Sequence, residues 1–308
     1  MAVVAVVGPT ATGKSDLGVA VAQALDGEVV NADALQLYRG MDIGTAKLPV
    51  AGRLGVPHHL LDVLDVGDDA SVEAYQRQVH AVLDDIAARG KVPVLVGGSG
   101  LYVRAALDRL EIPPTDPVVR SRLEHEAASV GAPAMHERLA AADPVAAQRI
   151  LPGNVRRVVR ALEVITLTGR PFTATLPEPR YLRPTVQIGL DAPREVLDAR
   201  IEARVQQMWR SGLLEEVSAL GARLRGSRTA GRAVGYAQAL AQLDGTLTPQ
   251  QAQDETARLT RRLSRRQRSW FGRDSRVHWL PVDTTDPVAA ALALVAAGAS
   301  PAMMASCS

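Results

Sequence analysis

Eight residues near the amino end have the types and spacing of a phosphate-binding loop. They are Gly8-Pro9-Thr10-Ala11-Thr12-Gly13-Lys14-Ser15, which follow the pattern G-x-x-x-x-G-K-S. In this pattern backbone N–H groups converge on phosphate oxygens, the lysine reaches the outer phosphates, and the serine hydroxyl stands where Mg²⁺ would bind. The sequence therefore predicts a phosphate site at this loop (the P-loop), with Ser15 on the metal side.

The segments on either side of the P-loop have the properties that such a site needs. The apolar run Val3–Val7 is typical of a buried strand, and 16–25 has apolar residues at helical spacing. The loop would then lead into a helix amino terminus, whose partial positive charge favours anions. A nucleoside triphosphate is the usual ligand, so a kinase or an ATPase is the default interpretation. Neither the paired Asp-Glu of ATPases nor the arginine-rich lid of small-molecule kinases is evident.

Two further apolar runs, 28–31 and 92–96, end in polar or glycine-rich loops, and a helical pattern over 72–88 lies between them. This alternation predicts a parallel sheet. Ligands of such sheets bind at the carboxyl ends of the strands, so the loops that follow the three strands should share one rim.

The character of the chain changes after a proline cluster at 113–117. We predict an inserted all-helical lobe over 115–184 and a core of 1–114 and 185–308, with a strand at 185–190 and a long helix over 194–211. The lobe helices are expected at 118–129, 134–141, 144–150 and 155–168. The predicted fold class is α/β, a P-loop NTPase-like parallel sheet flanked by helices, with this lobe inserted.

Asp33 is the best candidate for a general base. It follows a predicted strand that we expect beside the P-loop strand, where its carboxylate would face the ligand of the loop. Position alone equally allows an aspartate that caps the next turn, or an outer ligand of Mg²⁺.

Arginines are grouped in a way that favours phosphate partners. Arg200 and Arg204 share a helix face that suits a diphosphate, although a solvated basic face is the commoner explanation of such a pair. A larger group, with Leu259, Leu263 and Trp270 expected to pack inward, would fit a nucleic-acid backbone. Within this larger group, helical spacing places four arginines on one face: Arg258, Arg261, Arg262 and Arg265. A separate, smaller cluster comprises Arg156, Arg157 and Arg160.

Composition limits the class of protein. The 308 residues are 47% hydrophobic, enough for a sizeable core, and carry a net charge of +2. No apolar stretch approaches the ~20 residues of a membrane span, and no basic region precedes an apolar run at the start. The single cysteine, Cys307, excludes internal disulfides. We therefore expect a cytoplasmic, monomeric protein with no membrane partner.

Taken together, several segments resemble the tRNA dimethylallyltransferases, also called tRNA isopentenyltransferases, over nearly the whole chain. The segments that carry the resemblance are 8–15, 31–47, 57–62, 97–102, 143–144, 149–150, 160–164, 200–204, 212–213, 234–236 and 265–271. The resemblance implies transfer of a dimethylallyl group from dimethylallyl diphosphate to N6 of the adenosine 3′ of the anticodon, in tRNAs that read codons beginning with U. Mg²⁺ would be the cofactor.

The resemblance also implies roles for individual residues. Asp33 would be the general base, Thr10 and Lys14 would contact the leaving diphosphate, Ser15 would lie on the Mg²⁺ side, and Arg204 would clamp the diphosphate. The implied tRNA-contacting residues are Asp33, Ala34, Leu35, Gln36, Ser99, Arg120, Arg156, Arg157, Arg160, Arg232, Gly235 and Tyr236.

The chain departs from the family pattern at three places. Ala34 stands where serine is usual, Ser99 where threonine is usual, and Gly153-Asn154-Val155-Arg156 where Asn-Asp-x-Gln is common.

Three other functions stay open: a P-loop nucleoside or metabolite kinase, a prenyltransferase acting on free adenine nucleotide, and an RNA-binding protein whose P-loop is a regulatory switch.

Overall fold

The computed structural model describes residues 2–172 and 176–298 and divides the chain into two compact units. The core comprises Met1–Arg109 and Arg180–Ser308, and the lobe comprises Leu110–Pro179. The sequence placed the lobe at 115–184, five residues later at both ends. The difference arises because the two connecting segments pair with each other: Arg109 N–H donates to the carbonyl of Arg180 at 2.8 Å, so the returning chain joins the core early.

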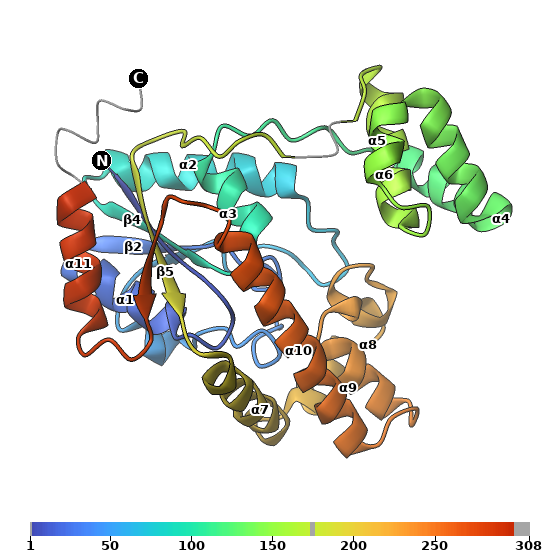
Figure 1. The fold of residues 1–308 in the computed structure, drawn as a ribbon. Coiled ribbons are helices and arrows are strands. Elements are labelled where there is room, and N and C mark those ends of the chain that lie inside the picture. Colours follow the sequence, from blue (N-terminus) through green and yellow to red (C-terminus); the bar gives the residue numbers. More distant parts are fainter. Residues whose placement is uncertain (1, 173–175, 299–308) are drawn as a thin grey trace. The chain divides into compact units, whose positions relative to one another are not determined.

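The core is built on a six-stranded, wholly parallel sheet in the order β3-β2-β4-β1-β5-β6 (Figure 1). Its strands are β1 (Val3–Val7), β2 (Gly27–Asn31), β3 (His58–His59), β4 (Val92–Gly97), β5 (Thr185–Asp191) and β6 (Val277–Pro281). Every residue of β1 is buried, as a central parallel strand covered on both faces requires. The predicted P-loop NTPase-like α/β fold is confirmed.

Two edge strands, β3 and β6, were not predicted. The two residues of β3 are histidines with structural roles: His59 Nε2 lies 2.6 Å from a Glu28 carboxylate oxygen, and His58 Nδ1 lies 2.9 Å from the Val56 carbonyl. Both histidines therefore make structural hydrogen bonds.

Helices cover both faces of the sheet. One face packs against α1 (Lys14–Ala24) and α11 (Pro287–Gly298), and the other against α2 (Val72–Ala88) and α3 (Gly100–Leu107). The apolar residues of β1, β4 and β5 form one core with α1, because Gly18 has no side chain and lets Val96 approach the helix. Cys307 lies outside the described residues.

A second group of helices follows β5 and carries the basic end of the chain. These are α7 (Arg194–Arg210), α8 (Leu213–Gly226), α9 (Tyr236–Leu243) and α10 (Pro249–Phe271). Helix α10 begins with a capping box in which Thr248 and Gln251 bond each other's backbone N–H groups. The prediction that Trp270 packs inward is wrong: its side chain is 39% exposed, because the buried face of α10 runs through Ser264, Gln267 and Phe271.

The lobe consists of α4 (Pro117–Ala142), α5 (Pro144–Arg149) and α6 (Val155–Thr168). Gly131, with φ 84°, interrupts α4, so the chain forms two helical segments there, as predicted. Asn154, in the segment that departs from the family pattern, caps α6 by accepting the Arg157 N–H. The lobe has an apolar core of its own, formed mainly by Leu123, Leu139 and Leu162 with their neighbours.

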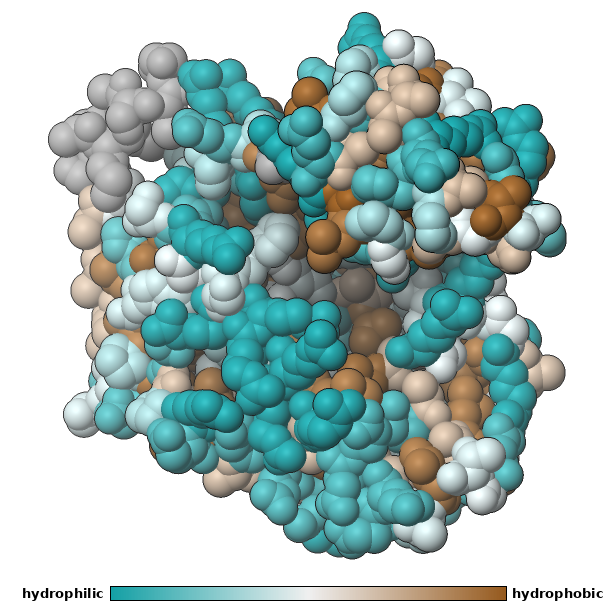
Figure 2. Space-filling view, turned by 45° about the vertical axis from the view of Figure 1, so that its right-hand side comes forward, coloured by the Kyte–Doolittle hydropathy of each residue, from teal (hydrophilic) through white to brown (hydrophobic). Residues whose placement is uncertain are grey.

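Hydrophilic side chains cover most of one face of the protein (Figure 2), with hydrophobic ones in small patches. Among residues 2–172 and 176–298, no helix has the length and apolar composition needed to cross a membrane.

Candidate active site

The P-loop connects β1 to α1 through a backbone that only certain residues can adopt. Gly8 has φ 130°, and a Cβ there would lie 2.4 Å from the Leu190 carbonyl oxygen of the neighbouring strand. Gly13 has φ 88° and immediately precedes α1. Ala11 also has a positive φ, 68°, which is unfavourable for a residue with a side chain. The surrounding structure must therefore hold this loop in shape.

Polar side chains from α7 reach the P-loop. Arg204 Nη1 donates to Thr10 Oγ1 at 3.2 Å, and Arg200 Nη1 donates to the Ala11 carbonyl at 3.4 Å. Arg204 is half-buried, whereas Arg200 is exposed. Inside the loop, Thr12 Oγ1 donates to the Pro9 carbonyl at 2.9 Å. The arginine pair thus faces the P-loop, and the explanation as a merely solvated face is wrong.

The strand order corrects one expectation about Asp33. The sequence placed its strand beside the P-loop strand, but β4 lies between β1 and β2. The loop after β1 and the loop after β2 still meet, because the strand between them, β4, ends in glycines. A Cβ on Gly97 would lie 2.3 Å from the Ala32 carbonyl oxygen, and one on Gly98 would lie 3.3 Å from that of Gly8. With no side chains above β4, the segments that follow β1 and β2 approach each other across it.

Asn31 fixes the turn that carries Asp33. Its side-chain amide donates to the carbonyls of Asp33, at 3.0 Å, and Leu60, at 2.9 Å, while its Oδ1 accepts the Asp33 N–H at 2.9 Å. Asp33 Oδ1 accepts the Leu35 N–H at 3.0 Å. Asp33 therefore does cap the next turn, and one of its carboxylate oxygens makes this local bond.

The charges of Lys14 and Asp33 act on each other. Burial lowers the pKa of Lys14 to about 7, an effect that Asp33 opposes and Arg204 strengthens. Burial raises the pKa of Asp33, and the Leu35 N–H and the charge of Lys14 oppose this rise. Lys14 Nζ donates to the Pro9 carbonyl. A titratable amine and a carboxylate with displaced pKa values thus lie on one rim, as at many functional sites.

The affinity for inorganic pyrophosphate is expected to fall as the pH rises above about 7. A diphosphate binds the ammonium form of Lys14 and raises its pKa, so binding is strongest below the free pKa of about 7 and is lost above it. The loss is at most about tenfold per pH unit. Calorimetric titration at fixed free Mg²⁺, from about pH 6 to about pH 9, measures it.

Lys14→Arg is the control for this prediction, because an arginine stays charged over the whole range. Protonation of the pyrophosphate itself affects both proteins equally, so the difference between their profiles reports Lys14 alone. Parallel profiles would contradict the predicted titration.

The segment after Asp33 is held by hydrogen bonds. Ser99 keeps the hydroxyl of the usual threonine, and its Oγ accepts the Ala34 N–H at 3.2 Å. Gln36 Nε2 donates to the Thr45 carbonyl at 3.2 Å, and Leu35 is half-buried. Ala34, Leu35, Gln36 and Ser99 thus lie on the segments that border Asp33, and their roles toward tRNA stay predictions.

Tyr236 has a structural contact that its expected role in tRNA binding did not foresee. Its side chain is completely buried, and its hydroxyl donates to Glu216 at 2.6 Å. The same Glu216 carboxylate accepts the N–H groups of Asp42, Ile43 and Gly44. The ring is therefore unavailable to tRNA in this structure, and it supports the segment that follows Gln36.

The other two residues of that predicted group differ from Tyr236. Arg232 is exposed, and Gly235, with φ 94°, precedes α9.

The buried Lys47 completes the support of this segment. Its Nζ donates to the Tyr38 carbonyl at 2.9 Å and to carboxylates of Asp42 and Asp62, each at 2.6 Å. Sequence reasoning assigned no role to Lys47 or Glu216, because their partners are distant in the chain or are backbone atoms.

In the lobe, the predicted tRNA-contacting arginines divide into two kinds. Arg120 and Arg160 both pair with the fully buried carboxylate of Glu163, at 2.6 and 2.8 Å. These contacts stabilise the lobe, because an unpaired charge at Glu163 would be costly. Arg156 and Arg157 are exposed on the first turn of α6.

The arginines at the end of the chain also divide. Arg258 pairs with Glu255, Arg268 with Asp191, and Arg276 with Asp108 and Asp274. Five others, Arg273 and four arginines of α10, make no ion pair among the residues that the structure describes. Those four are Arg261, Arg262, Arg265 and Arg266, which we call the arginine surface of α10.

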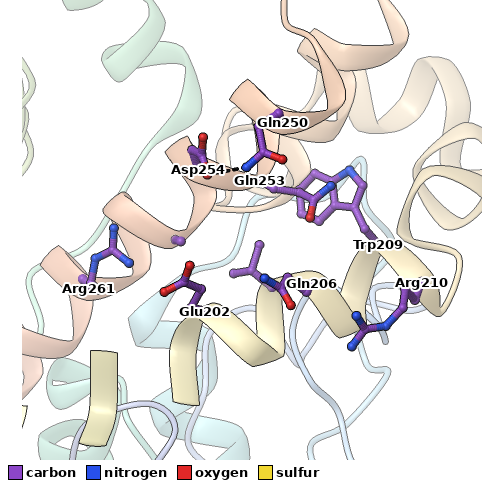
Figure 3. Close-up of a pocket in the computed structure, with 10 residues that line it drawn as sticks. Glu202, Gln206, Trp209, Arg210, Gln250, Gln253, Asp254 and Arg261 are labelled. Carbon is purple, nitrogen blue, oxygen red and sulfur yellow. Dashed lines mark hydrogen bonds between the residues drawn. The ribbon is translucent and has the colours of Figure 1, made fainter. Parts of the chain in front are cut away.

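A separate groove of about 570 Å³ lies between α7 and α10 (Figure 3). Glutamines and both acidic and basic side chains line it, including Glu202, Gln253 and Asp254. None of the P-loop residues and none of the residues near Asp33 line this groove, so it is distinct from the candidate site.

Fold and site together define a P-loop α/β protein that presents a lysine, an arginine and a carboxylate on one rim. A family model described as IPP transferase matches residues 36–274. Because this match covers more than half of the chain, the protein belongs to the IPP transferase family.

Sequence relatives of the chain support this family membership. The chain is 64% identical over 293 residues to a tRNA dimethylallyltransferase of Kineococcus radiotolerans, with 92% of each chain covered. It is 61% identical over 299 residues to one of Thermobifida fusca, covering 95% and 94% of the two chains.

Similar solved structures support this family membership as well. A tRNA isopentenylpyrophosphate transferase from Bacillus halodurans has a TM-score of 0.70 and 39% identity, with 96% of each chain covered. A eukaryotic dimethylallyltransferase acting on tRNA has a TM-score of 0.78 and 25% identity, covering 95% of this chain and 77% of that chain.

Proposed function

We propose that the protein transfers a dimethylallyl group from dimethylallyl diphosphate to N6 of the adenosine 3′ of the anticodon, in tRNAs that read codons beginning with U. The observation that carries this proposal is the placement of the Asp33 carboxylate within electrostatic reach of Lys14, beside a P-loop that Arg204 holds. The names of the relatives, tRNA dimethylallyltransferases, support the reaction and the tRNA substrate.

The reaction needs a stabilised leaving group and a base. The bond between the allylic carbon and the diphosphate oxygen breaks, and the diphosphate leaves with the electron pair. The P-loop N–H groups, Lys14 and Arg204 would stabilise the charge that builds on it. N6 of adenine, a weak nucleophile, forms the new carbon–nitrogen bond and gives its proton to Asp33, whose raised pKa makes it a stronger base than an ordinary aspartate.

The residues present fit a Mg²⁺ ion whose ligands would come partly from the protein and partly from the substrate. Among the described residues, no group of three or more His, Cys, Asp or Glu side chains could hold a metal. Mg²⁺ at phosphate sites characteristically keeps several waters and takes few protein ligands, so the Ser15 hydroxyl at the start of α1 would suffice together with diphosphate oxygens. When bound, Mg²⁺ would neutralise part of the diphosphate charge.

The arginine surface of α10 supports an RNA substrate. Four arginines without carboxylate partners present a strip of positive charge, which attracts a phosphate backbone. The target adenosine must also leave its stack to reach Asp33. Because all the groups proposed for the transfer belong to one chain, we propose that the protein acts as a monomer, and we place it in the cytoplasm.

The proposal is tested by incubating the purified protein with tRNA, dimethylallyl diphosphate and Mg²⁺, followed by mass spectrometry of the tRNA nucleosides. We expect N6-dimethylallyladenosine to form next to the anticodon. No prenylated adenosine in tRNA would contradict the proposal. A parallel reaction with AMP, in competition with tRNA, distinguishes a transferase that prefers free nucleotide, and a reaction with ATP and adenosine tests for a kinase.

A further inference from the structure

Gln267, on the last turns of α10, connects two loops of the candidate site. Its side-chain Oε1 accepts the backbone N–H of Thr10 at 2.9 Å, and its Nε2 donates to the Gly98 carbonyl at 2.9 Å. The residue is only 9% exposed. One buried amide therefore joins the P-loop to the loop that follows β4.

The space for this amide depends on Gly98. A Cβ on Gly98 would lie 2.5 Å from Gln267 Nε2, which is closer than any real contact of that kind. An alanine there would displace the amide first, and its methyl group would also lie 3.3 Å from the Gly8 carbonyl oxygen.

The P-loop needs such support because it contains a strained residue. Ala11 lies in the left-handed region, next to the residue whose N–H Gln267 accepts. A strained conformation persists only where neighbouring contacts determine it. Arg204 holds the side chain of Thr10, while Gln267 holds its backbone, so two helices hold this residue from different sides.

We propose that Gln267 is a positioning residue that presets the P-loop for the diphosphate of the prenyl donor. This inference rests on the proposed function for the identity of the donor, but not for the binding of a diphosphate. Gln267 acts through Thr10 and Gly98 and need not touch the substrate. Without it, the loop would leave the conformation that binds the diphosphate for part of the time, and affinity would fall by that fraction.

The test uses Gln267→Met, which keeps the approximate volume and removes both hydrogen bonds. Two lost hydrogen bonds should weaken the binding of inorganic pyrophosphate on the order of tenfold. We expect kcat/KM for dimethylallyl diphosphate to fall at least as much, with KM for tRNA unchanged. Thermal unfolding shows whether the variant is folded. Gly98→Ala, which keeps Gln267 but displaces its amide, should produce the same pattern.

Gln253→Ala is the matched control, because Gln253 belongs to the same helix but lines the groove between α7 and α10 (Figure 3). It should bind pyrophosphate like the wild type. Unchanged pyrophosphate binding in a folded Gln267→Met or Gly98→Ala protein would overturn the inference, as would an equal loss for tRNA. If Gln267→Met does not fold, Gly98→Ala decides.

The two proposals fail in different ways. If the wild-type protein makes no dimethylallyladenosine but Gln267→Met still weakens pyrophosphate binding, the proposed function fails and the positioning role stands. If the wild type transfers the group and the variants match it, the positioning role fails and the function stands.

Discussion

Replacing Asp33 by asparagine is expected to lower kcat for dimethylallyl transfer by about a thousandfold, since general-base catalysis typically contributes 10²–10⁴-fold. The asparagine keeps an oxygen that can accept the Leu35 N–H, so the turn should persist. Binding of tRNA should change little. Single-turnover assays with labelled donor, together with separate binding measurements, check this result.

Asp65→Asn is a suitable control, because Asp65 is an exposed aspartate whose carboxylate pairs with Arg39 at the surface. It should transfer the group at the wild-type rate. An Asp33→Asn enzyme that retained a tenth or more of the wild-type kcat would exclude Asp33 as the base.

The pH profile gives a second readout of the same group. A base must be ionised, so kcat should fall as the pH falls through the pKa of Asp33. Because burial raises that pKa, this acidic limb should lie above the range of an ordinary aspartate. The limb should be missing from the residual activity of Asp33→Asn.

Replacing Arg204 by alanine is expected to lower kcat by about a hundredfold to a thousandfold, the usual effect of removing one donor that stabilises developing negative charge. Arg204 combines a half-buried guanidinium with a hydrogen bond to Thr10 Oγ1. Its loss should therefore affect both the charge near the diphosphate and the shape of the P-loop. Steady-state kinetics with varied dimethylallyl diphosphate measure the change.

Arg200→Ala provides the comparison on the same helix. Arg200 is exposed and makes only a long contact, 3.4 Å, to the Ala11 carbonyl, so its effect should be less than about tenfold. A double-mutant cycle with Thr10→Val would separate the hydrogen bond from the charge, because the two single effects should not be additive if the contact matters. Equal losses in Arg200→Ala and Arg204→Ala would contradict the assigned difference.

Much of the fold could be predicted because its signals are local. The apolar run of β1, the glycines of the P-loop and the periodicity of α2 each act over a few residues. Gly131 likewise interrupts α4 where the sequence indicated a break. The short edge strands β3 and β6 were not predicted, because β3 consists of two histidines and each strand pairs with a strand that is distant in the chain.

The residue types of the candidate site could be predicted from the sequence, but the hydrogen bonds that connect its loops and helices could not. Lys14, Asp33 and Arg204 were assigned from motif and resemblance, and their catalytic roles stay predictions. Gln267 lies in the segment 265–271 that carries the family resemblance, but it was assigned no role, since a glutamine on a basic helix looks like any exposed polar residue. Tyr236 makes a structural contact that the motif did not predict, the hydrogen bond from its hydroxyl to Glu216, and its role toward tRNA stays a prediction.

By itself, the sequence determined the elements whose causes are local: a phosphate loop between a buried strand and a helix, a parallel sheet, and a helical insertion. Only the tertiary structure decided which strand separates Asp33 from the P-loop, and that glycines at the end of β4 let the two segments meet across it. The reason is physical. Strand order and close backbone approach depend on contacts between residues far apart in the chain, which no local pattern encodes.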